Sequence, residues 1–363
     1  MTAVDRQSLF SGTEAVPENL QLNEAALAEY LGGHFDGLGK DLVVTKFKGG
    51  QSNPTYMIRG REHSVVLRRR PPGALQPSAH AIDREYRVIS ALHAQGFPVP
   101  TPRLYCTDES IIGSAFYIVD CVDGRVFWNA ELPGLNAVDR RRIYEDMIEQ
   151  LARLHRLEPD AIGLGDFGPT ENYVERNLAR WSRIYQASQM VEIEDMGWLM
   201  DALRERVPKA QRTTLLHGDY GLYNIIVASE APRVRAILDW EMSTLGDPLV
   251  DLAHHVRPWW EIPDEEGRSV TSLVGNDLEA LGIPSLEEYV GRYCERVGIS
   301  NLNDWNFYLA YAQFRYAAMI QGVLKRAKQG NNPNRTVLHS QQRVVAIARL
   351  AKETLMRTQS EGA

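Results

Sequence analysis

The chain has 363 residues, of which 44% are hydrophobic and 24% charged, so it is long enough for two domains with substantial cores. Its net charge of −7 argues against nucleic acids and anionic membranes as partners, because both select a basic surface. It contains no run of eighteen apolar residues and no basic start followed by an apolar core, so we expect neither a transmembrane helix nor a secretory signal. The three cysteines are scattered, which favours a reducing cytoplasmic location over a disulfide or metal framework.

Residues 1–41 are predicted to form an extension that contains one helix. The segment 22–35 places Leu22, Leu27 and Leu31 on one helical stripe, whereas residues 1–20 are polar. We therefore expect a helix that is preceded by a loose segment.

Residues 42–122 are predicted to form a small β lobe. Strand-like runs, punctuated by glycine and proline, occur at 42–47, 55–59, 64–67, 103–107 and 115–120. A helix at 78–92 follows the third run and ends before Gly96 and Pro98. The expected lobe is antiparallel and five-stranded, with one helix.

Residues 123–357 are predicted to form a larger, mainly helical lobe. Helical patterns occur at 138–157, 171–190, 194–206, 285–297, 303–329 and 333–357. The sequence therefore predicts an α+β protein with two lobes.

The motif that carries chemistry spans residues 215–241. His217-Gly-Asp219 is followed by Asn224, five positions after the aspartate, and by Asp239, twenty positions after it. One carboxylate can accept a hydroxyl proton, while a carboxamide oxygen and a second carboxylate can bind Mg²⁺. The order and spacing match the kinase motifs H-R-D-x-x-x-x-N and D-F-G, with Gly for Arg in the first and Asp-Trp-Glu for the second. This indicates Asp219 as a base, and Asn224 and Asp239 as metal ligands.

Each part of this motif has a simpler interpretation when taken alone. The histidine of an H-G-D triplet can pack in a core, and an aspartate after a strand is often a cap or a turn former. However, Leu215–Leu216, Ile225–Val227 and Arg235–Leu238 have the pattern of short buried strands, and a hairpin-like arrangement would bring the three polar groups to one edge. The combination favours catalysis.

A glycine-rich loop lies between the first two predicted strands. Gly49 and Gly50 permit backbone angles that aim N–H groups at a phosphate, and Ser52 and Asn53 add side-chain donors. The alternative is an ordinary hairpin turn. Its place at the start of the β lobe favours a loop that covers the phosphates of ATP.

Arg68 is the predicted cation for the α- and β-phosphates. The run Val65–Arg68 aligns with the kinase sequence V-A-I-K, and strand alternation puts Arg68 on the face of Val66 and Arg69 on the other face. Arginine can bind phosphate through two parallel hydrogen bonds, although the arginine run can also be a solvated cluster. Glu85 is the expected partner of Arg68.

The alternative for Glu85 is a surface pairing with Arg84 or Arg87. After the last strand of the β lobe, the backbone of Asp120 and Val122 is expected to hydrogen-bond the adenine ring.

Five further polar residues receive mainly structural interpretations. Glu241 either shares the metal or surrounds it, and Asp247 and Asp251 are expected to cap and anchor the following helix. The neighbours His254 and His255 point about 100° apart on a helix, so packing is favoured over a shared metal.

The chain resembles the aminoglycoside phosphotransferase/choline-kinase-like superfamily over residues 40–355, in the segments HGDYGLYN, ILDWE with GDPLVDLA, VLRRRPPG and SAHAIDREYRVISAL. The similarity is to the branch that is fused to acyl-CoA dehydrogenases in larger eukaryotic proteins. It implies a bilobal protein-kinase-like fold, ATP, Mg²⁺ and phosphorylation of a small-molecule hydroxyl. Arg68 stands where aminoglycoside kinases carry lysine.

The expected function is therefore that of a small-molecule kinase, and the fused relatives suggest a hydroxy acid or a hydroxyacyl-CoA as acceptor. The alternative is a non-catalytic module that binds a nucleotide or acyl-CoA. An aminoglycoside kinase is less favoured, because a polycation needs an acidic pocket and only the short runs 192–195 and 264–266 are acidic. The aromatic residues of the helical lobe suit an acyl-bearing substrate better.

Overall fold

The computed structural model describes residues 11–36, 38, 41–49, 53–71, 82–209, 212–263, 271–329 and 341–357. The chain divides into two compact units. The first unit comprises Met1–Trp128, Ile162–Leu164 and Leu222–Ser243, and the second comprises Asn129–Ala161, Gly165–Gly221 and Thr244–Ala363. The segment 222–243 thus belongs to the first unit, whereas the predicted lobe boundaries, at residues 41 and 122, assign it to the helical lobe.

The first unit is built on a six-stranded antiparallel sheet in the order β1-β2-β3-β4-β6-β5. Its strands are β1 (Thr13–Glu14), β2 (Val43–Phe47), β3 (Thr55–Arg59), β4 (Ser64–Arg69), β5 (Pro102–Cys106) and β6 (Phe116–Asp120). The prediction of five strands was wrong by one. The added strand, β1, has two residues and pairs only with β2, so it leaves no periodic pattern in the sequence.

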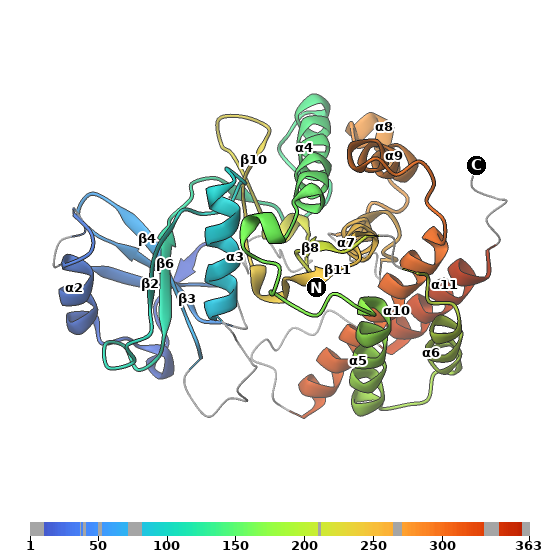
Figure 1. The fold of residues 1–363 in the computed structure, drawn as a ribbon, viewed down its shortest axis with the longest axis horizontal. Helices are drawn as coiled ribbons and strands as arrows, with labels where there is room; N and C mark the ends of the chain where they lie inside the picture. The colour runs from blue at the N-terminus through green and yellow to red at the C-terminus, as the bar shows by residue number, and fades with distance from the viewer. Residues whose placement is uncertain are drawn as a thin grey trace. The chain divides into compact units, whose positions relative to one another are not determined.

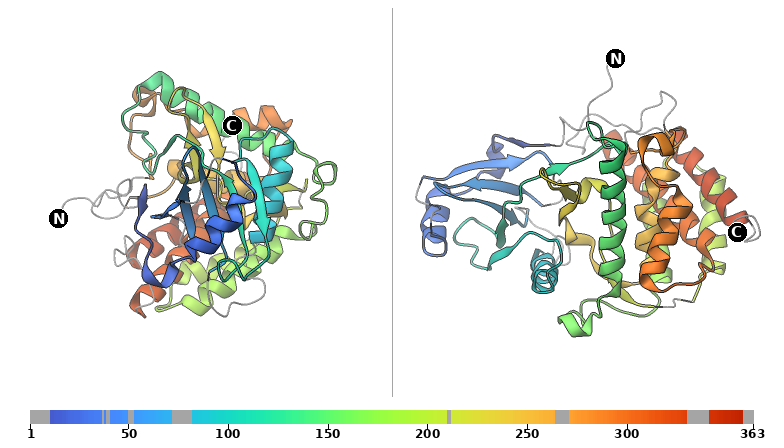
Figure 2. Two further views of the ribbon diagram at one scale, coloured as in Figure 1. Left: turned by 90° about the vertical axis from the view of Figure 1, so that its left-hand side faces the viewer. Right: turned by 90° about the horizontal axis from the view of Figure 1, so that it is seen from above.

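Two helices cover opposite faces of this sheet (Figure 1). Helix α2 (Glu24–Gly32) buries Leu27 and Leu31 against a core that includes Ile58, Leu67 and Ile118. Figure 2 shows α2 lying across the strands. Helix α3 (Ile82–Ala94) packs against β5 and β6 on the other face. Helix α2 of the predicted extension is therefore part of the core of the first unit.

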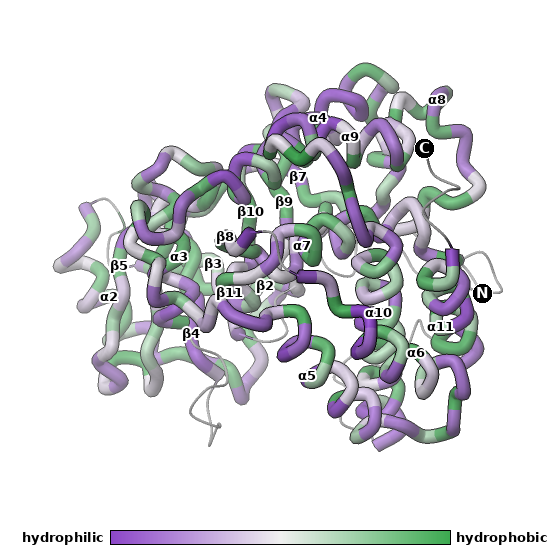
Figure 3. The backbone as a smooth tube through the Cα atoms, turned by 45° about the vertical axis from the view of Figure 1, so that its right-hand side comes forward, coloured by the Kyte–Doolittle hydropathy of each residue, from purple (hydrophilic) through white to green (hydrophobic). Residues whose placement is uncertain are grey.

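The first unit also holds a small sheet in the order β10-β9-β7. Its strands are β7 (Arg125–Val126), β9 (Ile225–Val227) and β10 (Val234–Ile237), and the short 3₁₀ helices η3 (Leu222–Asn224) and η4 (Trp240–Met242) flank β9 and β10. The residues of β9 are all buried, and this segment is strongly hydrophobic in Figure 3. The predicted hairpin of β9 and β10 is present.

The second unit is mainly helical. Its longer helices are α4 (Ala137–Arg156), α5 (Tyr173–Ser188), α6 (Glu194–Glu205), α7 (Pro248–His255), α9 (Leu286–Val297), α10 (Trp305–Lys328) and α11 (Gln341–Met356). A four-residue helix, α8 (Leu278–Leu281), precedes α9. Helix α10 packs against α11, α5 and α7, and α4 lies beside α9 (Figure 2). None of the helices in the described ranges is long and apolar enough to cross a membrane.

A two-stranded sheet in the second unit differs from the predicted grouping of β8 with the β9–β10 hairpin. Strand β8 (Thr214–Leu216) pairs with β11 (Thr244–Gly246), and not with β9 or β10. The sequence pattern identified β8, but it gave no signal for β11, which lies between η4 and the cap of α7.

Candidate active site

The predicted site residues are divided between the two units. The phosphate-binding candidates and the two metal-ligand candidates belong to the first unit, whereas Asp219 belongs to the second. Gly50 and Ser52 lie outside the described residues. Gly49 lies in the loop between β2 and β3.

Arg68 is the centre of a cluster of carboxylates in the first unit. It lies on β4, opposite Thr55 of β3 and Tyr117 of β6. Its Nε atom is 3.0 Å from Oε2 of Glu85 on α3, so the expected ion pair is present. Both side chains are buried, with residue exposures of 8% and 1%.

The same guanidinium also reaches the Asp-Trp-Glu segment. Nη2 of Arg68 lies 2.7 Å from Oδ1 of Asp239 and 2.9 Å from Oε2 of Glu241. Glu241 accepts a further hydrogen bond of 3.0 Å from Nδ2 of Asn53. Asn53 was predicted as a phosphate donor, but here its amide holds a carboxylate.

Arg69 points to the opposite face of the sheet, as strand alternation requires. It donates to the hydroxyl of Tyr56 and to the carbonyls of Ile112 and Leu20. Arg69 is therefore a structural residue that ties the segment before α2 to the sheet.

The electrostatics of the cluster favour a cationic ligand. Burial raises the pKa of Glu85 to about 7, against the lowering effect of Arg68. Burial alone would lower the pKa of Arg68, but Glu85 and Asp239 raise it well above its ordinary value, so the guanidinium is charged. One arginine faces three carboxyl groups, although within the described residues no three His, Cys, Asp or Glu side chains are arranged to hold a metal ion by themselves.

Asn224 and Asp239 lie at the same end of the β9–β10 hairpin. Asn224 ends η3 directly before β9, and the N–H of Leu238 donates to its carbonyl at 2.8 Å. Asp239 follows with a left-handed backbone, at φ 64° and ψ 61°, which turns the chain into η4. The hairpin thus brings together an amide and a carboxylate that can bind a metal.

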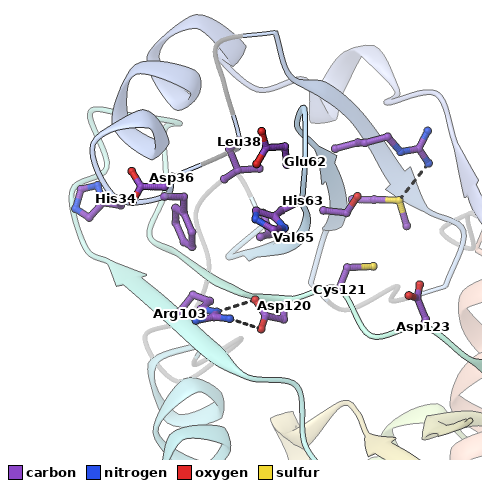
Figure 4. Close-up of a pocket in the computed structure, with 14 residues that line it drawn as sticks. His34, Asp36, Leu38, Glu62, His63, Val65, Arg103, Asp120, Cys121 and Asp123 are labelled. Atoms are coloured by element: carbon purple, nitrogen blue, oxygen red, sulfur yellow. Dashed lines mark hydrogen bonds and ion pairs between the residues drawn. The ribbon is translucent and has the colours of Figure 1, made fainter.

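The segment after β6 is partly engaged within the first unit. Asp120 accepts two hydrogen bonds from Arg103, at 2.7 and 2.6 Å, and donates its N–H to the carbonyl of Thr101. Both side chains line a cavity of about 740 Å³, to which His63, Cys121 and Asp123 also contribute (Figure 4). The N–H of Asp120 is therefore already bonded within the first unit and is not available for the predicted adenine contact.

Asp219 lies in a tightly held loop after β8. The carboxylate of Asp251 on α7 accepts the N–H groups of His217, at 2.6 Å, and of Gly218, at 3.0 Å. Arg315 of α10 donates to the carbonyl of Gly218 at 2.7 Å. Burial would raise the pKa of Asp251, but hydrogen bonds from the His155 side chain and the His217 N–H outweigh it and lower the pKa. The expected anchoring role of Asp251 is present.

The side chain that contacts Asp219 was not expected from the sequence. Nε2 of His254 lies 2.9 Å from Oδ1 of Asp219. His254 is three residues after Asp251 on α7, and this spacing, which puts both on one helix face, is the signal that could have identified it. His255, by contrast, packs in the core and hydrogen-bonds Tyr289.

Comparison with known proteins identifies the family of this chain. A family model described as "Phosphotransferase enzyme family" matches residues 43–289. The chain belongs to this family. It is 40% identical to mouse (Mus musculus) acyl-CoA dehydrogenase family member 10 over 93% of its length, and 39% identical to human (Homo sapiens) member 11 over 88%. It spans only 32% and 41% of these two relatives, so it covers less than half of each.

Solved structures show the same fold. A Ralstonia eutropha JMP134 protein, described provisionally as an aminoglycoside phosphotransferase, is 38% identical, with a TM-score of 0.82 over 92% of this chain and 98% of its own. Spectinomycin phosphotransferase, solved with ADP and spectinomycin, is 14% identical, with a TM-score of 0.58 over 92% of this chain and 97% of its own. The chain therefore has a kinase-like phosphotransferase fold, and its family and fold support a small-molecule phosphotransferase.

Proposed function

We propose that this chain transfers the γ-phosphoryl group of ATP to the hydroxyl of a small molecule. The observation that supports this most directly is the cluster in which Arg68 joins Glu85, Asp239 and Glu241. In protein kinases a lysine paired with a glutamate, together with an aspartate that holds Mg²⁺, must be in place for phosphoryl transfer, and Arg68 takes the position of that lysine in this proposal.

The residues of the first unit fit the nucleotide and the metal. Asn224 and Asp239 would hold Mg²⁺, which when bound neutralises charge on the phosphates. Glu241 completes this set of oxygen donors, and Asn53 keeps it in place. Arg68, fixed by Glu85, binds the α- and β-phosphates once the nucleotide is present.

Asp219 is the base in this proposal. It orients the acceptor hydroxyl and takes its proton while the oxygen attacks the γ-phosphorus in line. The loop that carries it is fixed by Asp251 and Arg315, so little reorganisation is needed at the moment of transfer.

For the acceptor we propose a hydroxy acid or a hydroxyacyl-CoA. The proposal draws on the relatives named acyl-CoA dehydrogenase family members. Of the two acidic runs considered for a polycation, residues 264–266 lie outside the described residues. In the other run, Glu194 and Asp195 lie in the first turn of α6, and Asp195 pairs with Lys352.

A non-catalytic nucleotide- or acyl-CoA-binding module is the second candidate. It is favoured by one observation, since Arg68 replaces the usual lysine and contacts the carboxylates that would hold the metal. This module would bind ADP without turnover.

A ³¹P NMR screen with Mg·ATP distinguishes the two candidates. Hydroxy acids, their CoA thioesters, amino alcohols, sugars and aminoglycosides are tested as acceptors of the full chain. We expect one class to yield a phosphate ester, Asp239→Ala to abolish it, and the control Asp83→Ala, an exposed residue of α3, to leave it unchanged. Transfer retained by Asp239→Ala refutes the assignment.

A further inference from the structure

One face of helix α7 holds the loop of Asp219 at two points. Asp251 binds the backbone N–H groups of His217 and Gly218, and His254 binds the Asp219 side chain. The His254 side chain is 7% exposed and that of Asp219 is 31% exposed. The carboxylate of Asp219 is thus partly exposed to solvent, while a buried imidazole contacts its Oδ1 atom.

The chemistry of the two groups fixes the direction of this hydrogen bond. An ionised carboxylate only accepts, so Nε2 of His254 must carry the hydrogen and donate to Oδ1. Burial lowers the pKa of His254. The charges of Arg315 and Arg257 lower this pKa further, whereas the hydrogen bond and the charge of Asp219 act to raise it. His255, the neighbour on α7, is buried as well, and its pKa is lowered to about 3. The imidazole of His254 is therefore neutral at physiological pH.

We propose that His254 is a positioning residue for Asp219, whose Nε2–H holds Oδ1 and directs the other oxygen, Oδ2, to the acceptor hydroxyl. This inference rests on the proposed function. In the transfer step the acceptor O–H bond breaks and its proton moves to Oδ2, while a bond forms between the acceptor oxygen and the γ-phosphorus. The bond from the γ-phosphorus to ADP breaks, and its electron pair stays with ADP. His254 keeps its own proton throughout.

Two substitutions separate positioning from simple filling of space. His254→Gln keeps an amide N–H that can donate to Oδ1, whereas His254→Leu keeps similar bulk without a donor. A merely structural role predicts that the two variants behave alike. A positioning role predicts that only the leucine variant loses turnover.

The kinetic experiment uses the full chain with Mg·ATP alone, so that water is the acceptor and ADP release is measured. We expect kcat to fall about 10- to 100-fold in His254→Leu, since a hydrogen bond to a charged group is lost. The KM for ATP should be unchanged, and His254→Gln should stay within about threefold of the wild type. Loss of the donor disfavours the ionised carboxylate, so the acidic limb of the kcat profile should move to higher pH in the leucine variant. Equal kinetics in both variants overturn the proposal.

A second measurement does not depend on turnover. In protein labelled with ¹⁵N-histidine, NMR reports which ring nitrogen of His254 carries the proton, with the resonance assigned by its loss in His254→Gln. We expect the neutral Nε2–H form near pH 7, and a changed shift in Asp219→Ala. An Nε2 atom that carries no proton overturns the proposal, even if the enzyme is active. The expected tautomer without turnover retains the hydrogen bond and overturns the proposed function alone.

Discussion

Replacing Glu85 by glutamine measures how much the ionisation of this buried residue lowers the free energy of unfolding. Burial raises the pKa of Glu85 from 4.5 to about 7, even with Arg68 beside it. Between these values the folded chain binds more protons than the unfolded chain, so the contribution of Glu85 to stability falls as the pH rises through this window. At about 1.4 kcal/mol per pKa unit, the shift corresponds to about 3 kcal/mol.

Glutamine keeps the size of the side chain but cannot ionise. We therefore expect Glu85→Gln to match the wild type near pH 4.5 and to exceed its free energy of unfolding by about 3 kcal/mol near pH 8. The measurement is urea unfolding at several pH values with EDTA present, followed by tryptophan fluorescence. The control is Glu62→Gln, an exposed residue of the β3–β4 turn, which should not raise the free energy of unfolding near pH 8.

The result that refutes this reasoning is a Glu85→Gln variant that is less stable than the wild type near pH 8. It would mean that the ion pair with Arg68 more than offsets the cost of burying the Glu85 charge.

Three further substitutions test the fold and the loop of the base. Leu27→Ala should lower the free energy of unfolding by about 2–5 kcal/mol, because Leu27 is fully buried, whereas exposed Val43→Ala should change it by less than about 0.5 kcal/mol in the same urea titration. Gly124→Ala should lower the free energy of unfolding by about 1–3 kcal/mol, because an added Cβ would lie 2.4 Å from Cγ2 of Ile226 and the backbone φ of residue 124 is 153°. Unfolding curves equal to those of the wild type would contradict this. Asp251→Asn should lower turnover about 10- to 100-fold in a coupled ADP-release assay, whereas ADP binding measured by calorimetry should be unchanged. Normal turnover would show that the hydrogen bonds between Asp251 and the loop of Asp219 are not needed for activity.

Local patterns in the sequence predicted most elements and part of the cluster around Arg68. Alternation along β4 separated Arg68 from Arg69, whereas the pairing of Arg68 with Glu85 was expected from the order of parts in kinases, and the structure contains this ion pair. The spacing of Asn224 and Asp239 predicted one hairpin, because each lies beside a short apolar run. These patterns can be read from the sequence because they depend only on residues that are close together in the chain.

The missed features depend on contacts between distant segments. Strand β1 is too short to show a period, and the pairing of β8 with β11 has no local signature. The hydrogen bond from His254 to Asp219 joins residues 35 positions apart, and its only local trace is the spacing from Asp251.

The sequence by itself determined which chemical groups this protein has and how they are spaced along strands and helices. Only the tertiary structure decided their partners, such as the contact of Arg68 with Asp239 across 171 positions. The physical reason is that side-chain periodicity fixes the face on which a residue lies, whereas the packing of whole elements decides what that face meets.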